Sequence, residues 1–139
     1  MNPPFGSDEF WLDVAGDEAV KASCRRRNVG AVLTVAGVPW GYGHNWTPAG
    51  TSCDAGDCPR GLKSVEEAPP GQPPYDDCLS IHAEMTALMA GAAHSALSVK
   101  GFAEVVRGGT MYVTSKPCEE CDSLLQKFGV VVIYPSAVA

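Results

Sequence analysis

The sequence is organised around two short motifs, His82-Ala83-Glu84 and Pro117-Cys118-Glu119-Glu120-Cys121. One imidazole and two thiolates suit Zn²⁺, and three protein ligands leave the fourth tetrahedral position open for water. Cys118 and Cys121 are three residues apart, so on a helix both sulfur atoms face the same side. Glu84 follows His82 closely enough to exchange protons with a water molecule on the metal. The two motifs together predict a catalytic zinc centre.

Each motif alone has a simpler interpretation. A single histidine is commonly a core or surface residue, and a Cys-x-x-Cys pair is typical of redox proteins and of structural zinc sites. Because both motifs occur in one chain, in this order, we favour the catalytic zinc centre.

Length, charge and cysteine content restrict the class of protein. A chain of 139 residues predicts one domain over 1–139, with a loose tail over 1–8 and an irregular, proline-rich loop over 51–78. The net charge of −6 argues against binding to long nucleic acid, because such binding depends on neutralising phosphates. There is no long apolar run and no signal-peptide pattern, so we expect a cytoplasmic protein without membrane contact. Six cysteines in such a chain indicate metal ligands rather than disulfides.

The apolar pattern predicts an α/β sandwich with a mixed sheet. We expect the last strand to be central, because it is entirely apolar. The expected elements are a helix over 9–23 capped by Asp8, strands over 29–35 and 40–45 joined by a turn over 36–39, a helix from 81 to between 91 and 95, a strand over 110–114, a helix that starts near Pro117 and is closed by Gly129, and a strand over 130–134.

His-x-Glu followed by Pro-Cys-x-x-Cys resembles the zinc-dependent cytidine deaminase superfamily. The Val-Gly-Ala strand at 29–31 and the loop at 43–50 are most similar to its deoxycytidylate (dCMP) deaminase branch, although His44 and Trp46 depart from that pattern. The resemblance implies a three-layer α/β/α cytidine-deaminase-like fold and a homo-oligomer, either a dimer or a hexamer. Members usually add further secondary structure after the last strand, whereas this sequence stops at Ala139.

The resemblance also implies an activity, the hydrolytic deamination of dCMP to dUMP and ammonia, with Glu84 as the acid and base. It implies that the Ala83 N–H binds the ring oxygen O2 and that the carbonyl of Thr114 or Ser115 orients the amino group. It further implies that Asn45 binds a sugar hydroxyl. The alternative for Asn45 is that its side chain only turns the chain.

Two further sets of residues are candidates for binding, one for a substrate phosphate and the other for a second zinc ion. Arg26 or Arg27 would contact the 5′-phosphate of a nucleotide, or else the basic triplet is a solvated helix end. In some members of the branch a second, structural zinc is present, and here its four ligands would be Cys24, Cys53, Cys58 and Cys78. The alternative is that these four are unpaired buried thiols.

Other functions remain open from the sequence. One is a deaminase of another substrate, such as cytidine, guanine or a tRNA adenosine. Another is a zinc-binding module without turnover, against which the non-ligand Glu84 argues. The third is a thiol oxidoreductase, which would hold no metal at Cys118 and Cys121.

Overall fold

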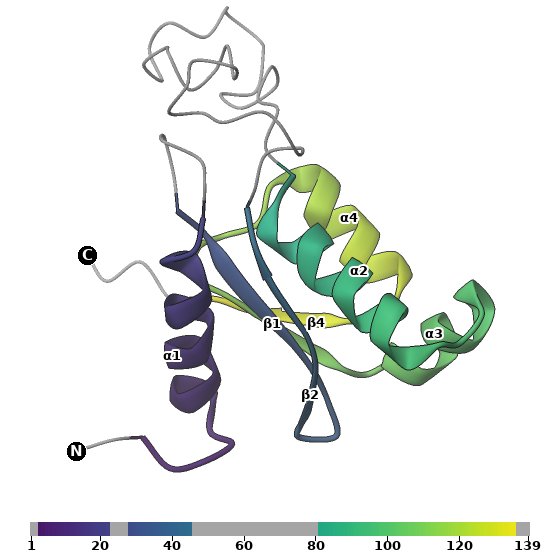
Figure 1. The fold of residues 1–139 in the computed structure, drawn as a ribbon, viewed down its shortest axis with the longest axis horizontal. Coiled ribbons are helices and arrows are strands. Elements are labelled where there is room, and N and C mark those ends of the chain that lie inside the picture. Colours follow the sequence, from purple (N-terminus) through teal and green to yellow (C-terminus); the bar gives the residue numbers. More distant parts are fainter. Residues whose placement is uncertain (1–2, 23–27, 46–80, 136–139) are drawn as a thin grey trace, which may run out of the picture.

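The computed structural model describes residues 3–22, 28–45 and 81–135, which form a four-stranded sheet between two layers of helices (Figure 1). The strand order is β2 (Val38–His44), β1 (Gly30–Val35), β3 (Thr110–Val113) and β4 (Val131–Ile133). β1 is antiparallel to both neighbours, and β3 is parallel to β4, so the sheet is mixed as predicted.

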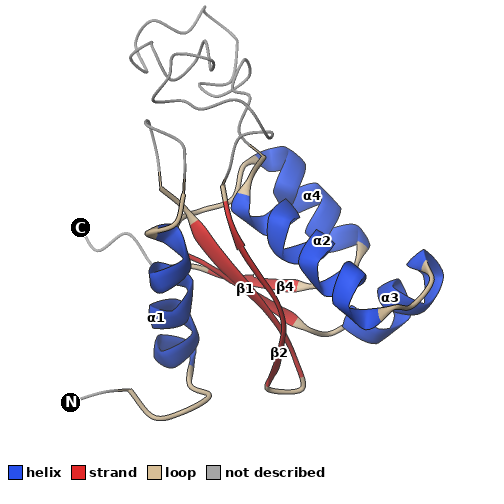
Figure 2. Cartoon of the chain, in the orientation of Figure 1, coloured by secondary structure: helices blue, strands red, loops and turns tan. Residues whose placement is uncertain are grey.

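The helices cover both faces of the sheet (Figure 2). α1 (Asp8–Ala19) lies on one face. α2 (Ala83–Ser95), α3 (Val99–Val106) and α4 (Glu119–Lys127) lie on the other face. The prediction of a three-layer α/β/α fold is therefore confirmed. None of the helices in the described part of the chain has the length and apolar character that crossing a membrane requires.

The central strand β1 contributes to two separate apolar cores because its side chains alternate between the two faces of the sheet. Ala31 and Leu33 belong to the larger core with α2, α3 and α4. Val32 belongs to the smaller core, where it packs with Trp11 of α1 and Tyr112 of β3. The buried, β-branched character of this strand follows from burial on both faces.

The turn between β1 and β2 contains two residues, Ala36 and Gly37, both with positive φ of 52° and 79°. Two consecutive residues with positive φ are typical of the type I′ hairpin turn, whose twist matches that of the strands. The predicted turn over 36–39 is therefore shorter in the structure, and β2 begins at Val38.

Glycines allow α2 to pack directly on the backbone of β2. A Cβ atom on Gly43 would clash with the carbonyl oxygen of Ala83 and the backbone nitrogen of Ala87, and one on Gly41 would clash with Ala87 and Gly91 in the same way. This close approach places the end of β2 against the first turn of α2.

The helix boundaries differ from the prediction in two places. α1 is capped by Ser7, whose hydroxyl accepts from Phe10 N at 3.1 Å, and Asp8 is already the first helical residue. The predicted loose tail over 1–8 thus overlaps the start of α1. The helix also ends at Ala19, four residues earlier than predicted. The second difference concerns α2: the helix predicted to start at residue 81 begins at Ala83.

The sequence analysis did not predict α3. Ala96 adopts a left-handed conformation that ends α2, and Ser98 then caps a new helix by accepting from Gly101 N at 3.0 Å. Gly101 and the β-branched valines of this segment have low helix propensity, which hides it in a sequence pattern. Its amphipathic face buries Phe102 and Val106 against the larger core.

The prediction that the last strand is central is wrong within the described residues. β4 pairs only with β3 there and lies at the edge of the sheet, and Val131 is 56% exposed. The apolar run has another cause: Val130 and Val132 pack on the larger core, while Ile133 packs on the smaller one. As predicted, Gly129 follows α4 with a positive φ of 69°.

Candidate active site

Two of the predicted metal ligands stand at the positions where helices begin. His82 is the N-cap of α2 and Cys118 is the N-cap of α4, both with extended backbone. Neither side chain makes a capping hydrogen bond to its own helix. Pro117 lies just ahead of α4, where its missing N–H is tolerated. The two helix starts therefore bring an imidazole and a thiol to the same end of the sheet.

The structure gathers His82, Cys118 and Cys121 into one cluster whose ligand atoms lie within 4.8 Å of one another. The Nδ1 atom of His82 is 3.4 Å from Cys118 Sγ and 3.3 Å from Cys121 Sγ. A tetrahedral zinc with ordinary Zn–N and Zn–S bonds places its nitrogen and sulfur ligands about 3.6 Å apart. The two nitrogen–sulfur distances therefore agree with a zinc ion to within a few tenths of an ångström.

The electrostatics of the cluster also favour a bound cation. Cys121 is 4% exposed, and this burial is the main cause that raises the pKa of its thiol. The negative charges of Glu84 and Cys118 raise that pKa further. A coordinating metal ion deprotonates such a thiol and neutralises the charge that its surroundings disfavour.

Glu84 lies beside the cluster without belonging to it. It is the second residue of α2, it is only 4% exposed, and it lies close enough to Cys121 to raise the pKa of that thiol. The N-terminal end of a helix favours a carboxylate at this position. A buried carboxyl group next to a three-ligand metal centre can move protons to and from a molecule held at the fourth position.

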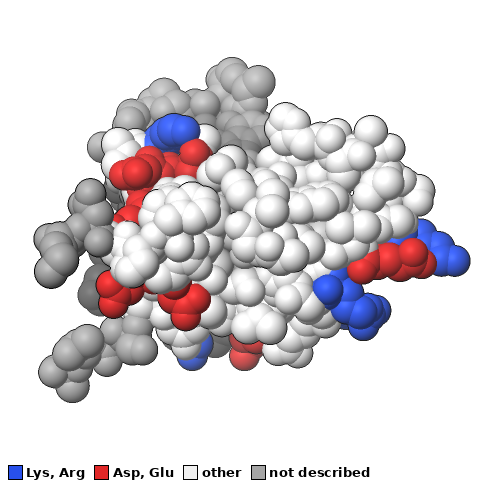
Figure 3. Space-filling view, turned by 90° about the horizontal axis from the view of Figure 1, so that it is seen from below, with Lys and Arg blue, Asp and Glu red and all other residues white. Residues whose placement is uncertain are grey.

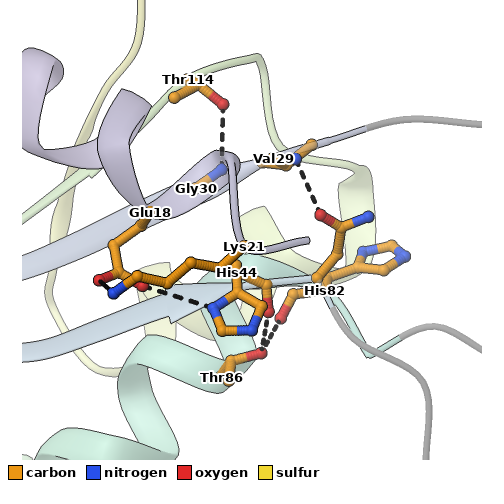
Figure 4. A network of polar contacts seen from close by, with 9 residues as sticks. Glu18, Lys21, Val29, Gly30, His44, His82, Thr86 and Thr114 are labelled. Atoms are coloured by element: carbon orange, nitrogen blue, oxygen red, sulfur yellow. Dashed lines mark hydrogen bonds and ion pairs between the residues drawn. The ribbon is translucent and has the colours of Figure 1, made fainter. Parts of the chain in front are cut away.

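Thr86 joins the start of α2 to the end of β2. Its hydroxyl lies 2.8 Å from the carbonyl oxygen of His82 and 3.0 Å from that of His44, as Figure 4 shows. The His44 ring faces the other way, with Nδ1 3.4 Å from the carboxylate of Glu18 in α1. Glu18 also binds Lys21 at 2.8 Å, which raises the pKa of that lysine through the hydrogen bond and the opposite charge.

Asn45 follows β2 directly and is 5% exposed. Its side-chain oxygen accepts from Val29 N at 2.8 Å, and its backbone N–H donates to Val29 O at 3.2 Å. These bonds pair Asn45 with Val29 of the neighbouring segment and fix the position of its side chain. The predicted sugar contact of Asn45 and the alternative that it only turns the chain both stay predictions.

The segment between β3 and α4 carries two more predicted residues. Thr114 N donates to Gly30 O at 3.0 Å, and the Thr114 hydroxyl accepts from Gly30 N at 3.1 Å. These two bonds extend the pairing of β3 with β1 by one residue past the end of β3, and Figure 4 draws the bond to the Thr114 hydroxyl. Ser115 comes next and leads toward Cys118. Ala83, at the start of α2, is fully buried.

Several predicted site residues lie outside the described residues. These are the phosphate candidates and the ligands of the predicted second zinc, namely Arg26, Arg27, Cys24, Cys53, Cys58 and Cys78. Trp46 and the loop over 51–78 lie outside them as well. Sequence reasoning missed Thr86. Its only signal was a polar residue in the first turn of a helix, between Ala83 and Ala87, and that signal does not reveal the contact with His44.

Comparison with known proteins places this fold and site in a class. The family described as the cytidine and deoxycytidylate deaminase zinc-binding region matches residues 6–136. A three-layer α/β/α fold with a His-Cys-Cys cluster and an adjacent carboxyl group agrees with that description. The chain belongs to this deaminase family.

Individual relatives agree. A deoxycytidylate deaminase of Mycobacterium phage D29 is 33% identical over 133 residues, which cover 92% of this chain and 93% of the phage protein. A deoxycytidylate deaminase of Schizosaccharomyces pombe is 29% identical over 124 residues, but these cover only 34% of the yeast protein. Among solved structures, the dCMP deaminase of cyanophage S-TIM5 in complex with dCMP and dUMP has a TM-score of 0.65 and 26% identity, over 96% of this chain and 82% of the phage chain.

These comparisons confirm the predicted family, the fold class and zinc as the cofactor of the family. The predicted second zinc and the single domain over 1–139 stay predictions.

Proposed function

We propose that the protein is a zinc-dependent deoxycytidylate deaminase of nucleotide metabolism, a hydrolase that converts dCMP and water to dUMP and ammonia. The observation that carries the proposal is the buried carboxyl group of Glu84 beside the His82, Cys118 and Cys121 cluster. A nucleotide substrate is supported by the two relatives called deoxycytidylate deaminase and by the cyanophage structure with dCMP and dUMP.

Glu84 is the proposed acid and base. Zinc held by the three ligands would lower the pKa of a water molecule to about 7 and so supply the nucleophile. Glu84 would accept one proton of this water at a carboxylate oxygen and deliver it to N3 of cytosine as a C–O bond forms at C4. The other proton of the water would pass through Glu84 to the exocyclic amino group, the C4–N bond would break, and ammonia would leave. The water oxygen would become the O4 of dUMP.

Backbone groups and Asn45 are proposed to orient the substrate. The first N–H groups of a helix have no intrahelical acceptor, which suits the Ala83 N–H to the ring oxygen O2. The carbonyl of Thr114 or Ser115 is held near the start of α4 by the bonds to Gly30 and would accept from the amino group. Asn45, fixed by Val29, would bind the sugar hydroxyl.

The phosphate contact and the second zinc concern residues outside the described ranges. We propose Arg26 or Arg27 for the 5′-phosphate, because a guanidinium group forms paired hydrogen bonds with phosphate. We propose a structural zinc for the four remaining cysteines, Cys24, Cys53, Cys58 and Cys78. Metal analysis tests the latter: two zinc ions per chain support it, and one rejects it.

The distribution of charge on the surface bears on the kind of ligand. On the face shown in Figure 3, most Asp and Glu side chains lie toward the left and one group lies at the right, and the Lys and Arg side chains of its described part form separate small groups rather than one continuous patch. Together with the net charge of −6, this supports a small nucleotide rather than long nucleic acid as the ligand. We propose a cytoplasmic homo-oligomer, a dimer or a hexamer, which light scattering can test.

An ammonia-release assay tests the function. The zinc-loaded protein is given dCMP, CMP, cytidine, guanine and tRNA, each with and without dCTP or dTTP. We expect the highest kcat/KM with dCMP. A higher value with another substrate would replace dCMP with that substrate. Absence of ammonia from every substrate, in a protein that metal analysis shows to contain zinc, would indicate a binding module instead.

A further inference from the structure

The hydroxyl of Thr86 connects two segments that are far apart in the sequence. It lies 2.8 Å from the carbonyl oxygen of His82 and 3.0 Å from the carbonyl oxygen of His44, 42 residues away (Figure 4). A hydroxyl has one hydrogen, so the two oxygens share it. Bonding from a helical threonine to the residue four positions earlier is common in helices. The contact with the His44 carbonyl is unusual, because His44 lies on another element, β2.

Each acceptor adjoins a group of the active site. His82 is a zinc ligand and the N-cap of α2, and its side chain makes no capping bond. The position of the His82 backbone is instead fixed through its carbonyl oxygen, which accepts from Thr86 N at 3.0 Å and from the Thr86 hydroxyl at 2.8 Å. His44 is followed by Asn45, the proposed sugar contact. The hydroxyl thus sits between the metal-binding end of α2 and the substrate-binding end of β2.

The backbones of β2 and α2 are in direct contact near Thr86. Gly43 lies against the backbone of Ala83 and Ala87, so the end of β2 touches the first turn of α2. Gly30 and His44 are partners in register but exchange no hydrogen bond, because the N–H and the carbonyl of Gly30 bond to Thr114 on the other side of β1. The carbonyl of His44 therefore points away from β1, and the hydroxyl of Thr86 lies 3.0 Å from it.

We propose that Thr86 is a positioning residue that fixes the His82 backbone to the end of β2. This bond keeps Nδ1 of His82 directed at Cys118 and Cys121 and holds Asn45 in register with the metal centre. The inference rests on the proposed function, because it assumes that the His82 cluster binds zinc.

The test compares Thr86→Val with two control variants. Thr86→Val keeps the shape and removes the hydroxyl. Thr86→Ser restores the hydroxyl. Thr34→Val removes another buried threonine hydroxyl, which donates to Thr110 O at 3.4 Å between β1 and β3, away from the cluster. Zinc affinity is measured by competition with a chromogenic chelator. The visible d–d bands of the Co²⁺-substituted proteins report the geometry of the ligands.

We expect zinc affinity to fall about 10- to 100-fold in Thr86→Val, the usual effect of losing a group that orients a metal ligand. The Co²⁺ bands should shift in the same variant, and KM for dCMP should rise. Thr86→Ser and Thr34→Val should bind zinc like the unaltered protein. If Thr86→Val does not fold, Thr86→Ala removes the same hydroxyl and gives the same comparison.

Three results would overturn the inference: unchanged zinc affinity in Thr86→Val, an equal loss in Thr34→Val, or no rescue by Thr86→Ser. These results are separable from failure of the proposed function. If the unaltered protein binds zinc but releases no ammonia from dCMP, the deaminase proposal fails, while the zinc affinities still decide the role of Thr86.

Discussion

Glu84 combines two properties that a merely structural glutamate rarely combines. It is almost completely buried, and it lies beside Cys121, a predicted metal ligand whose pKa its charge raises. Burying a carboxyl group is costly unless it is hydrogen-bonded or paired. A role in proton transfer gives a reason for keeping it there.

We therefore expect Glu84→Gln to keep the fold and the zinc but to lose about 10²- to 10⁴-fold in kcat, the usual contribution of a positioned acid and base. The measurement is kcat with dCMP together with the zinc content. Glu119→Gln is the matched control, because it changes an exposed glutamate in the first turn of α4. Activity retained in Glu84→Gln would reject the assigned role.

Tyr112 lies on the opposite face of the sheet, and its ionisation should make the stability of the protein depend on pH. Its hydroxyl donates to Asp8 at 2.8 Å, and burial, followed by this bond and the charge of Asp8, raises its pKa from 10.0 to about 12. The unfolded chain releases this proton at lower pH than the folded chain does. Stability is therefore lost as the pH rises from 10.0 toward about 12.

The measurement is urea unfolding of the unaltered protein and of Tyr112→Phe across that pH range. Below it, the unaltered protein should be the more stable by about 1 kcal/mol, the net value of one hydrogen bond. Within it, this advantage should shrink. A constant difference at every pH would show that the hydroxyl does not titrate differently in the two states.

At the level of the elements, the contact between β2 and α2 determines where the site forms. Gly43 and Gly41 let the two backbones touch, and no side chain fits between them. We expect Gly43→Ala to lower the free energy of unfolding by about 1–3 kcal/mol, because an added methyl group forces the elements apart. It should also weaken zinc binding, since the first turn of α2 would move.

Gly16→Ala is the control for this substitution. Gly16 lies inside α1, and a Cβ atom there meets no other atom within 4 Å. Alanine should stabilise that helix by about 0.5–1 kcal/mol. Chemical denaturation of both variants is the measurement. Equal effects of the two substitutions would contradict the close contact between β2 and α2.

Some helices and strands could be predicted from the sequence and others could not. Long amphipathic or apolar segments, such as those of α1, β1 and β3, were recognised because their periodicity reflects burial. α3 was missed, because a glycine and three valines in an eight-residue helix disguise its propensity. The edge position of β4 was also missed, because an apolar sequence reports burial of side chains and not the number of neighbouring strands.

For the whole molecule, the metal centre connects parts that are distant in sequence. His82 is the N-cap of α2, Cys118 is the N-cap of α4 and Cys121 lies within α4, and both helices pack on the same face of the sheet. Residue types and spacing were enough to predict these ligands. The contacts of Thr86 and Asn45 were not predictable, because they depend on which segments the fold brings together.

Removing zinc should therefore destabilise the molecule as a whole. At a free zinc concentration 100 times the dissociation constant, binding adds about 2.7 kcal/mol to the free energy of unfolding. We expect a strong chelator to lower the thermal midpoint of the unaltered protein, as measured by circular dichroism. Cys121→Ala, which lacks one ligand, should respond much less. An identical response of both proteins would place the stabilising metal elsewhere.

The absence of a capping bond at His82 and Cys118 has one more consequence. Serine or asparagine at the start of a helix stabilises it by about 0.5–2 kcal/mol relative to residues that do not cap. Replacing Cys118 with serine would therefore strengthen α4 in the metal-free chain while it abolishes turnover. When zinc is scarce, directed evolution for heat resistance would be drawn toward such inactive variants, whereas with ample zinc the lost metal costs more than the cap adds. Selections for thermostable lineages of this enzyme should therefore supply zinc throughout.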